Sequence, residues 1–383
     1  MRKQAQRALV LVTDAYGGRG GIALYCRNLL RALCEYPGME RVVAVPRKIV
    51  YELEEMPANL RYCSEAAGNN ITFLLACFRV VLSERRFDLL ICGHIHLLPV
   101  ARLLGIVYGC PVIPVIYGVE SWAPTPHRSV NFFCRKLKSF ISIRRLTAKR
   151  LMDWAKTPNA CYYYLPNCID DSQYGIRERR NDLIERYNIR GKTVIMTAGR
   201  LDAGLDLNKG FDEILEVLPE LLRRIPELTY LVMGDGEDRA RLERKATQLG
   251  VSRAVIFTGY VSDAEKADHY RLADVFAMPG RNPAFDRYPF RFVFLEALTC
   301  GVPVVGCTPE DPSEIEDPHS QLIIQVDPNK NNEIIDGILI ALSRPKGTQQ
   351  PGIENFYFAK FKTMFHEIVS GNLLKDSPMR LQH

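Results

Sequence analysis

The sequence predicts an α/β protein built from two doubly wound, Rossmann-like domains. Short apolar runs alternate with helix-compatible segments along most of the 383 residues. This alternation predicts parallel sheets with helices on both faces. A glycine-containing turn follows the first expected strand of each half, at Gly17–Gly21 and at Gly199. The length also suggests two domains, and a polar, charged stretch from Pro166 to Arg190 separates them.

Composition excludes several classes of protein. The chain is 47% hydrophobic and 25% charged, which is typical of globular domains. It has no run of 18 apolar residues, so we expect no membrane span, and its N-terminus resembles a first strand more than a signal peptide. The eleven cysteines are scattered without a C-x-x-C pair. That pattern indicates reduced thiols in a cytosolic protein, with neither a zinc site nor a disulfide framework.

The first half alternates strands and helices in chain order. Expected strands are Ala8–Val12, Val42–Val45, Leu89–Cys92, Val112–Ile116, Ser139–Ile143 and Tyr162–Leu165, and expected helices are Ile22–Cys34, Ile71–Arg85 and Leu97–Val107. The loop after the first strand reads G-G-R-G-G and lacks the G-x-G-x-x-G spacing of a dinucleotide site. From the residues alone it is either a nucleotide-binding loop or a flexible surface loop. Gly20, His94, His96 and Tyr117 would fall at the carboxyl ends of strands, where such sheets bind ligands.

A basic segment closes the first half. Residues His127–Arg150 hold eight Lys or Arg and no Asp or Glu, with apolar and aromatic side chains between them. One interpretation is a surface that rests on anionic lipid headgroups. The other is a helix and a strand with a solvated basic face, which is what charge runs usually are.

The second half repeats the alternation. Expected strands are Thr193–Thr197, Tyr230–Val232, Val255–Thr258, Val275–Met278 and Val302–Val305, and expected helices are Phe211–Arg224, Asp238–Leu249, Ala264–Leu272, Phe290–Thr299 and Glu354–Val369. Arg200 and Lys209 flank its first strand-to-helix turn. A guanidinium and an ammonium at that position can neutralise two phosphates together.

A loop that leads into a helix lies within Arg281–Gly306. The start of such a helix presents free N–H groups and a positive dipole end, which suit a phosphate. Glu296 comes nearly two turns later, so its carboxylate can accept hydrogen bonds from a ribose lying along the helix. The alternative is an ordinary amphipathic helix with a solvated Glu296.

Seven motifs together resemble one enzyme family. In chain order they read G-G-R-G-G-I-A, L-P-N-C-I-D, G-R-L with K-G, G-D-G-E-D-R-A-R-L, F-T-G-Y-V-S-D, Y-R-L-A-D-V-F-A-M-P and L-E-A-L-T-C-G-V-P-V-V. Nearly the whole chain is similar to family-4 glycosyltransferases of the GT-B fold, of the type found in bacterial polysaccharide biosynthesis. The resemblance implies two facing Rossmann-like domains with an interdomain cleft. Residues 1–170 would form the acceptor-side domain and 171–353 the nucleotide-sugar-binding domain, with a C-terminal helix, about 354–383, crossing back to the first.

The resemblance also implies roles for individual residues. Arg200 and Lys209 match the pair that holds the donor diphosphate, and Glu296 matches the glutamate that holds the ribose. The remaining implied donor-binding residues are Gly20, Gly21, Gly199, Tyr260, Val261, Phe290, Arg291 and Phe292.

Two positions depart from the family pattern. Tyr288 stands where the family has the first glutamate of its motif, and Tyr117 stands where relatives have a histidine near the reacting sugar. Tyrosine titrates near ~10, so it is a poor proton shuttle at neutral pH. Arg200, Lys209, Tyr117 and Tyr288 are the candidate catalytic residues, with the last two expected to matter less.

The leading hypothesis is a retaining hexosyltransferase that uses a UDP- or GDP-sugar and a glycan or polyprenyl-linked acceptor. No Asp/His cluster suggests a metal, so we expect no metal and no cofactor, with the basic pair in the metal's place. We expect a cytoplasmic protein, or one peripheral on the inner face of the membrane, with no nucleic-acid partner. One alternative is a catalytically weak, nucleotide-sugar-binding subunit of a glycan assembly complex, which the two tyrosines support. Another GT-B enzyme, such as an epimerase, is disfavoured by the order of the motifs.

Overall fold

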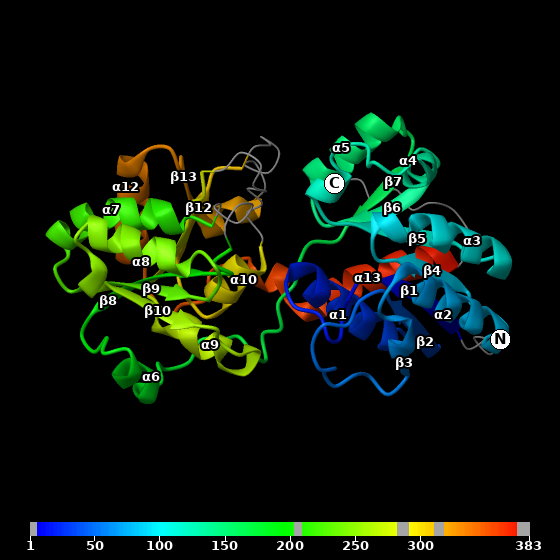
Figure 1. Ribbon diagram of the computed structural model, residues 1–383, viewed down its shortest axis with the longest axis horizontal. Coiled ribbons are helices and arrows are strands. Elements are labelled where there is room, and N and C mark those ends of the chain that lie inside the picture. Colours follow the sequence, from blue (N-terminus) through cyan, green and yellow to red (C-terminus); the bar gives the residue numbers. More distant parts are fainter. Residues whose placement is uncertain (1–5, 203–208, 282–290, 310–317, 374–383) are drawn as a thin grey trace. The chain divides into compact units, whose positions relative to one another are not determined.

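The computed structural model describes residues 6–202, 209–281, 291–309 and 318–373. The chain divides into two compact units (Figure 1). One unit contains Met1–Cys168 together with Phe358–His383, and the other contains Ile169–Tyr357. The boundaries expected from the sequence, after residues 170 and 353, lie close to these.

The first unit is built on a parallel sheet. Within the described residues it has seven strands in the order β3-β2-β1-β4-β5-β6-β7. They are β1 Gln6–Val12, β2 Met39–Pro46, β3 Leu60–Tyr62, β4 Leu89–Cys92, β5 Val112–Ile116, β6 Ser139–Ser142 and β7 Cys161–Tyr164. The strand order reverses between β1 and β4, which is the switch point where doubly wound sheets bind ligands.

Helices cover both faces of this sheet. They are α1 Gly21–Cys34, α2 Asn70–Ser83, α3 Leu98–Tyr108, α4 Arg128–Cys134, α5 Arg145–Ala155 and α13 Phe358–Leu373. The last helix joins the first unit by packing on α1. Lys362 Nζ donates to Glu35 at 2.7 Å, and the His366 ring nitrogen lies 2.7 Å from the Ala32 carbonyl oxygen.

The second unit repeats the plan. Its parallel sheet has, among the described residues, six strands in the order β10-β9-β8-β11-β12-β13. They are β8 Thr193–Ala198, β9 Leu228–Met233, β10 Val255–Gly259, β11 Val275–Met278, β12 Val304–Cys307 and β13 Ile323–Val326. The helices are α6 Asn181–Arg186, α7 Phe211–Arg224, α8 Arg239–Gln248, α9 Asp263–Leu272, α10 Phe292–Thr299 and α12 Asn331–Ser343. Here the order reverses between β8 and β11.

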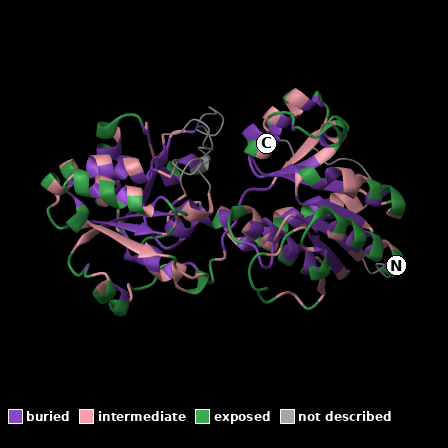
Figure 2. Ribbon diagram, viewed as in Figure 1, coloured by how far each residue is buried: buried purple, intermediate pink, exposed green. Residues whose placement is uncertain are grey.

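The prediction of two doubly wound parallel sheets is confirmed. Central strands such as β1 and β9 are apolar on both faces and almost wholly buried (Figure 2), as parallel strands between two helix layers must be. The sequence analysis missed β3, β13, α5, α6 and α12. Helix α10 begins at Phe292, and the start expected for it, Phe290, lies outside the described residues.

Candidate functional site

The loops after β8 and β9 touch backbone to backbone. The amide of Gly199 donates to the Met233 carbonyl at 2.9 Å, and the amide of Leu201 donates to the Asp235 carbonyl at 2.9 Å. The ladder between the strands therefore continues beyond their carboxyl ends. A Cβ on Gly234 would lie 1.9 Å from the carbonyl oxygen of Gly199, so only glycine fits there.

Two further glycines hold this edge of the second sheet together. Gly236 has a φ of +157°, and its Cβ would lie 2.2 Å from the carbonyl oxygen of Leu201. Gly210 has a φ of +79°, and its Cβ would lie 2.6 Å from Cδ of Pro279, which follows β11. The loops after β8, β9 and β11 thus meet at the switch point of the sheet.

Arg200 and Lys209 lie together at this meeting point. The Lys209 stem passes over Gly199, whose absent Cβ would lie 2.6 Å from Lys209 Cδ. Lys209 Nζ then donates to the main-chain carbonyl of Arg200 at 2.9 Å. The Arg200 side chain is 80% exposed, and its Nε lies 3.2 Å from the Asp202 carboxylate. The Lys209 ammonium therefore lies beside the main chain of Arg200, and the Arg200 guanidinium extends into solvent.

The segment predicted to read the base lies along the same edge. Gly259, which ends β10, forms an antiparallel bridge with Gly234. The next residue, Tyr260, is exposed, whereas Val261 packs against the core of the unit. A line of backbone contacts therefore runs from the Tyr260 loop through Gly234 to Gly199.

Helix α10 begins at the same carboxyl edge of the sheet, because it follows β11. Arg291 is its N-cap residue and Phe292 its first helical residue. Two other predicted site residues, Tyr288 and Phe290, lie outside the described residues. The roles assigned to Arg291 and Phe292 stay predictions.

Glu296 has a different environment from the one expected. Its side chain is fully buried, and three side chains from other parts of the unit donate to its carboxylate. These are Tyr174 at 3.0 Å, Lys266 at 2.6 Å and Tyr270 at 2.6 Å. Glu296 therefore fastens α10 to α9, which carries two of the donors. The solvated alternative is wrong, and the ribose contact stays a prediction that this geometry does not favour.

A second buried carboxyl near the cations was missed. Glu213, in the first turn of α7, accepts from the Arg281 amide at 2.9 Å, and burial raises its pKa. It links the helix that follows Lys209 to the chain beyond β11. An acidic residue in the first turn of a helix was the signal available in the sequence.

Gly20 and Gly21 lie at the start of α1, beyond the carboxyl end of β1. Gly20 is the N-cap with a φ of +97°, and a Cβ there would meet nothing within 4 Å. Glycine is needed at this position for its backbone conformation and not for space. Both residues are exposed, so the backbone of the predicted loop is accessible.

Tyr117 is turned into the first unit. Its hydroxyl lies 3.2 Å from the thiol of Cys26, and its ring packs edge-on against Tyr25. Burial raises the pKa of this hydroxyl well above its ordinary value. Direct contact with substrate is disfavoured by this placement, and the catalytic role of Tyr117 stays a prediction.

His94 is a further candidate that the sequence analysis left without a role. It follows β4, and its ring lies 6.5 Å from that of Tyr117. The His96 amide donates to His94 Nδ1 at 3.2 Å, so the neutral ring carries its proton on Nε2. Burial lowers the pKa of His94 to about 4. His94 is therefore a neutral hydrogen-bond donor at neutral pH.

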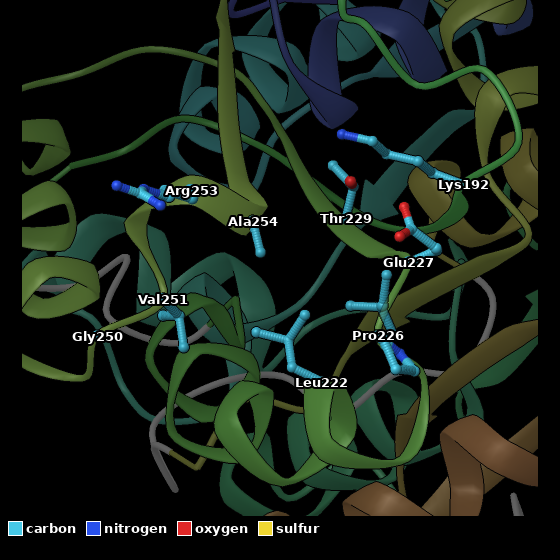
Figure 3. A pocket seen from close by; sticks show the side chains of 10 residues that line it. Lys192, Leu222, Pro226, Glu227, Thr229, Gly250, Val251, Arg253 and Ala254 are labelled. Carbon is cyan, nitrogen blue, oxygen red and sulfur yellow. The ribbon is translucent and has the colours of Figure 1, made fainter.

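A pocket of about 250 Å³ lies elsewhere in the second unit (Figure 3). It opens at the amino-terminal ends of β8, β9 and β10, with Lys192 and Arg253 on opposite sides. Sheets of this kind bind ligands at the other edge. We therefore place the candidate site at the Arg200–Lys209 edge and not in this pocket.

The described residues offer neither a metal-ligand cluster nor a membrane-spanning helix. They contain no group of three or more His, Cys, Asp or Glu side chains placed to hold a metal ion. Within the same residues, every helix is too short or too polar to cross a bilayer.

Most of the second unit matches a known protein family. The family profile described as glycosyl transferases group 1 matches residues 180–355. A GDP-mannose-dependent alpha-(1-6)-phosphatidylinositol monomannoside mannosyltransferase from Mycolicibacterium smegmatis is 35% identical over 167 residues, which span 43% of this chain and 42% of that enzyme. The match thus spans less than half the length of that relative. A GDP-mannose-dependent monoacylated alpha-(1-6)-phosphatidylinositol monomannoside mannosyltransferase from Corynebacterium glutamicum is 23% identical over 88% of this chain and 89% of its own.

Solved structures share the fold. Sucrose-phosphate synthase from Thermosynechococcus elongatus superposes with a TM-score of 0.73 at 16% identity, over 95% of this chain and 98% of that one. HepE from Anabaena in complex with UDP gives a TM-score of 0.71 at 17% identity, over 95% and 100%. At these identities the likeness concerns the fold alone.

The Glu296 cluster predicts a stability effect. Glu296→Gln keeps the shape but removes the charge that Lys266 and two tyrosines contact, so we expect the unfolding free energy to fall by about 2–3 kcal/mol. Calorimetric unfolding measures this, with Glu220→Gln, an ion-paired glutamate of α7 whose side chain is 32% exposed, as a control that should change little. An unchanged melting profile combined with weakened nucleotide binding would show instead that Glu296 serves the ligand.

The lowered pKa of His94 predicts that the stability of the first unit depends on pH. Its folded pKa of about 4 lies below the unfolded value of about 6.5, so the unfolded chain binds the additional proton between these values. Stability should therefore fall as the pH decreases through this window, by up to about 3 kcal/mol. His94→Gln should flatten that fall, and His127→Gln, an exposed control, should not. Both tryptophans, Trp122 and Trp154, belong to the first unit, so their fluorescence follows its unfolding. Equal slopes in all three proteins would contradict the assignment.

Proposed function

We propose that this chain transfers a hexose from a nucleoside diphosphate sugar to a glycan or lipid-linked acceptor, and the match of residues 180–355 to the group 1 glycosyl transferases supports this proposal. The observation that carries the proposal is the pairing of Arg200 and Lys209 at the switch point of the second sheet. Such switch points are where nucleotides bind in doubly wound folds. Two cations there match the charge of a diphosphate.

The two cations would stabilise the negative charge of the departing diphosphate. In a transfer, the bond between the sugar carbon and the diphosphate oxygen breaks, and negative charge grows on that oxygen. Fixed positive groups that face this charge lower the barrier, because they need no rearrangement during the reaction. Lys209 is held by its bond to the Arg200 carbonyl, and Gly199 leaves room for its stem. Exposed Arg200 can follow the diphosphate as it leaves.

The reaction as proposed proceeds with retention. The acceptor hydroxyl then approaches the face from which the diphosphate leaves, and its proton can pass to the departing phosphate oxygen. No side chain is needed as the base in this scheme. The burial of Tyr117 against Cys26 is compatible with it. His94, at the same edge of the first sheet, can donate from Nε2 to a sugar or acceptor hydroxyl.

The proposed donor is GDP-mannose, with a UDP-hexose as the alternative. The relatives from Mycolicibacterium and Corynebacterium are named as GDP-mannose-dependent enzymes acting on phosphatidylinositol mannosides, and the second of these aligns along most of both chains. We also propose that the acceptor is a lipid-linked glycan and that the protein lies peripherally on an anionic membrane.

A second candidate function is a nucleotide-sugar-binding subunit with little activity. One observation favours it. The Tyr117 hydroxyl is buried within 3.2 Å of the Cys26 thiol, at the position where the family resemblance implies a histidine beside the sugar. Transfer of mannose from GDP-mannose to any mannoside acceptor by the purified protein would exclude it.

The diphosphate site predicts a specific loss of affinity. Each cation makes charge-assisted bonds worth about 1.5–3 kcal/mol, so Arg200→Ala with Lys209→Ala should weaken GDP binding by about 100-fold or more. Isothermal titration with GDP, UDP and guanosine measures this, and guanosine affinity should change much less than GDP affinity.

The pocket in Figure 3 supplies the matched control. Lys192→Ala with Arg253→Ala removes one lysine and one arginine from the opposite edge of the same sheet. GDP affinity should survive that change. If this control loses affinity for GDP while the Arg200, Lys209 variant keeps it, the nucleotide binds at the amino-terminal edge. That result would contradict the proposal.

A further inference from the structure

The pocket at the amino-terminal edge of the second sheet has the features of a separate ligand site. It has a volume of about 250 Å³ and lies between the end of α7 and the starts of β8, β9 and β10 (Figure 3). The proposed donor site is at the opposite edge of this sheet, so a ligand here would be a different molecule. Pockets for drug-sized ligands measure about 300–1,000 Å³, so this pocket suits a smaller one.

Two cations of the pocket have no partner in the described part of the chain. Lys192 directly precedes β8 and Arg253 lies just before β10, on opposite sides of the pocket (Figure 3). Within the described residues, no hydrogen bond or ion pair engages either side chain. Arg241 of the neighbouring α8, by contrast, pairs with Asp212 and Asp238. Lys192 and Arg253 are therefore available to an anion from solution.

An aliphatic wall lies between these cations, and solvated surface cations alone do not need one. Leu222 and Pro226 come from the end of α7 and the turn after it, and Val251 and Ala254 come from the segment before β10. Figure 3 shows these four side chains around one space. A molecule that fills the space would bury apolar area, which the hydrophobic effect favours.

Two further polar residues line the pocket. Thr229 of β9 is almost fully buried, yet its hydroxyl has no hydrogen-bond partner among the described residues. Buried hydroxyls ordinarily have one, so this bond is left to water or to a ligand. Glu227 contributes a carboxylate to the lining. Two cations against one carboxylate leave the lining with net positive charge, which favours a ligand with net negative charge.

We propose that this pocket binds a small amphipathic organic anion. Its phosphate or carboxylate group is attracted by Lys192 and Arg253, and its apolar body packs against the aliphatic wall. Inorganic phosphate would use the charge but leave the wall in contact with water, and a neutral apolar molecule would leave the cations unmatched. The inference goes beyond the proposed function and does not depend on it, because it uses neither Arg200 nor Lys209.

Phenyl phosphate is a suitable probe, because it joins a phosphate group to an apolar ring. Isothermal titration of the full chain with up to about 10 mM probe should detect its binding. Phenyl phosphate should bind about tenfold or more tightly than inorganic phosphate or phenol, because only the probe engages both the cations and the wall. Benzoate, titrated in the same way, shows whether a carboxylate binds more tightly than a phosphate.

Two variants separate the charge of the pocket from its shape. Lys192→Ala with Arg253→Ala should weaken phenyl phosphate binding about tenfold or more, because charge-assisted hydrogen bonds are lost. Ala254→Leu keeps both cations but fills the space beside the wall. It should weaken phenyl phosphate binding to a similar extent and leave the weaker binding of inorganic phosphate unchanged. Thermal unfolding midpoints equal to that of the parent should show that both variants are folded.

The opposite edge of the sheet supplies the matched control. Arg200→Ala with Lys209→Ala removes the same two residue types there, and this variant should bind phenyl phosphate as tightly as the parent does. Loss of binding in this variant, with normal binding in both pocket variants, would overturn the inference.

Two other results would also overturn it. One is inorganic phosphate that binds as tightly as phenyl phosphate, since the wall would then contribute nothing. The other is a parent chain that binds neither phenyl phosphate nor benzoate at about 10 mM. A chain that binds phenyl phosphate in this pocket but transfers no sugar would contradict the proposed function and leave this inference standing.

Discussion

The approach of Gly199 to Gly234 is the constraint on which the candidate site depends. A side chain on Gly234 would collide with the Gly199 carbonyl at 1.9 Å, so the loops after β8 and β9 can meet only as bare backbone. That contact continues the sheet to Leu201 and fixes the direction of the Arg200 carbonyl. Lys209 then bonds to that carbonyl. The position of the two cations is therefore a consequence of backbone geometry.

The proposed anion site at this edge would need few specialised residues. Glycines bring the loops together, and a lysine and an arginine supply the charge. The buried carboxyls, Glu213 and Glu296, do not face this charge as competitors. They accept from Arg281 and from Lys266 with its neighbouring tyrosines, which fastens α7 and α10 in place. These two buried carboxyls stabilise the scaffold of the second unit, whereas the exposed Asp202 carboxylate pairs with Arg200.

Local patterns predicted the sheets and the basic pair, but not the contacts between distant residues. Alternation of apolar runs and helices is visible within short windows, and Arg200 and Lys209 are recognisable by their place after a strand. Glu296 is different, because its partners Tyr174 and Lys266 lie far away in the sequence.

Tyr117 illustrates the same limit. Its residue type suggested an altered active site, yet its hydroxyl lies beside the thiol of Cys26 on α1, and no local pattern links these two residues. Strand β13 was missed for a related reason. Its four residues, IIQV, are short and include a polar side chain, so they form a strand mainly because β12 lies beside them.

Hydrogen–deuterium exchange with and without GDP tests the central claim most directly, because it reports which edge of the second sheet the nucleotide covers. Binding at the proposed site should slow exchange at residues 199–202 and 234–236 and around Tyr260, whose loops meet at the carboxyl edge. Residues 226–229 and 250–254, which line the pocket at the opposite edge, should exchange as before. Protection of those residues, with none at the carboxyl edge, would contradict the account.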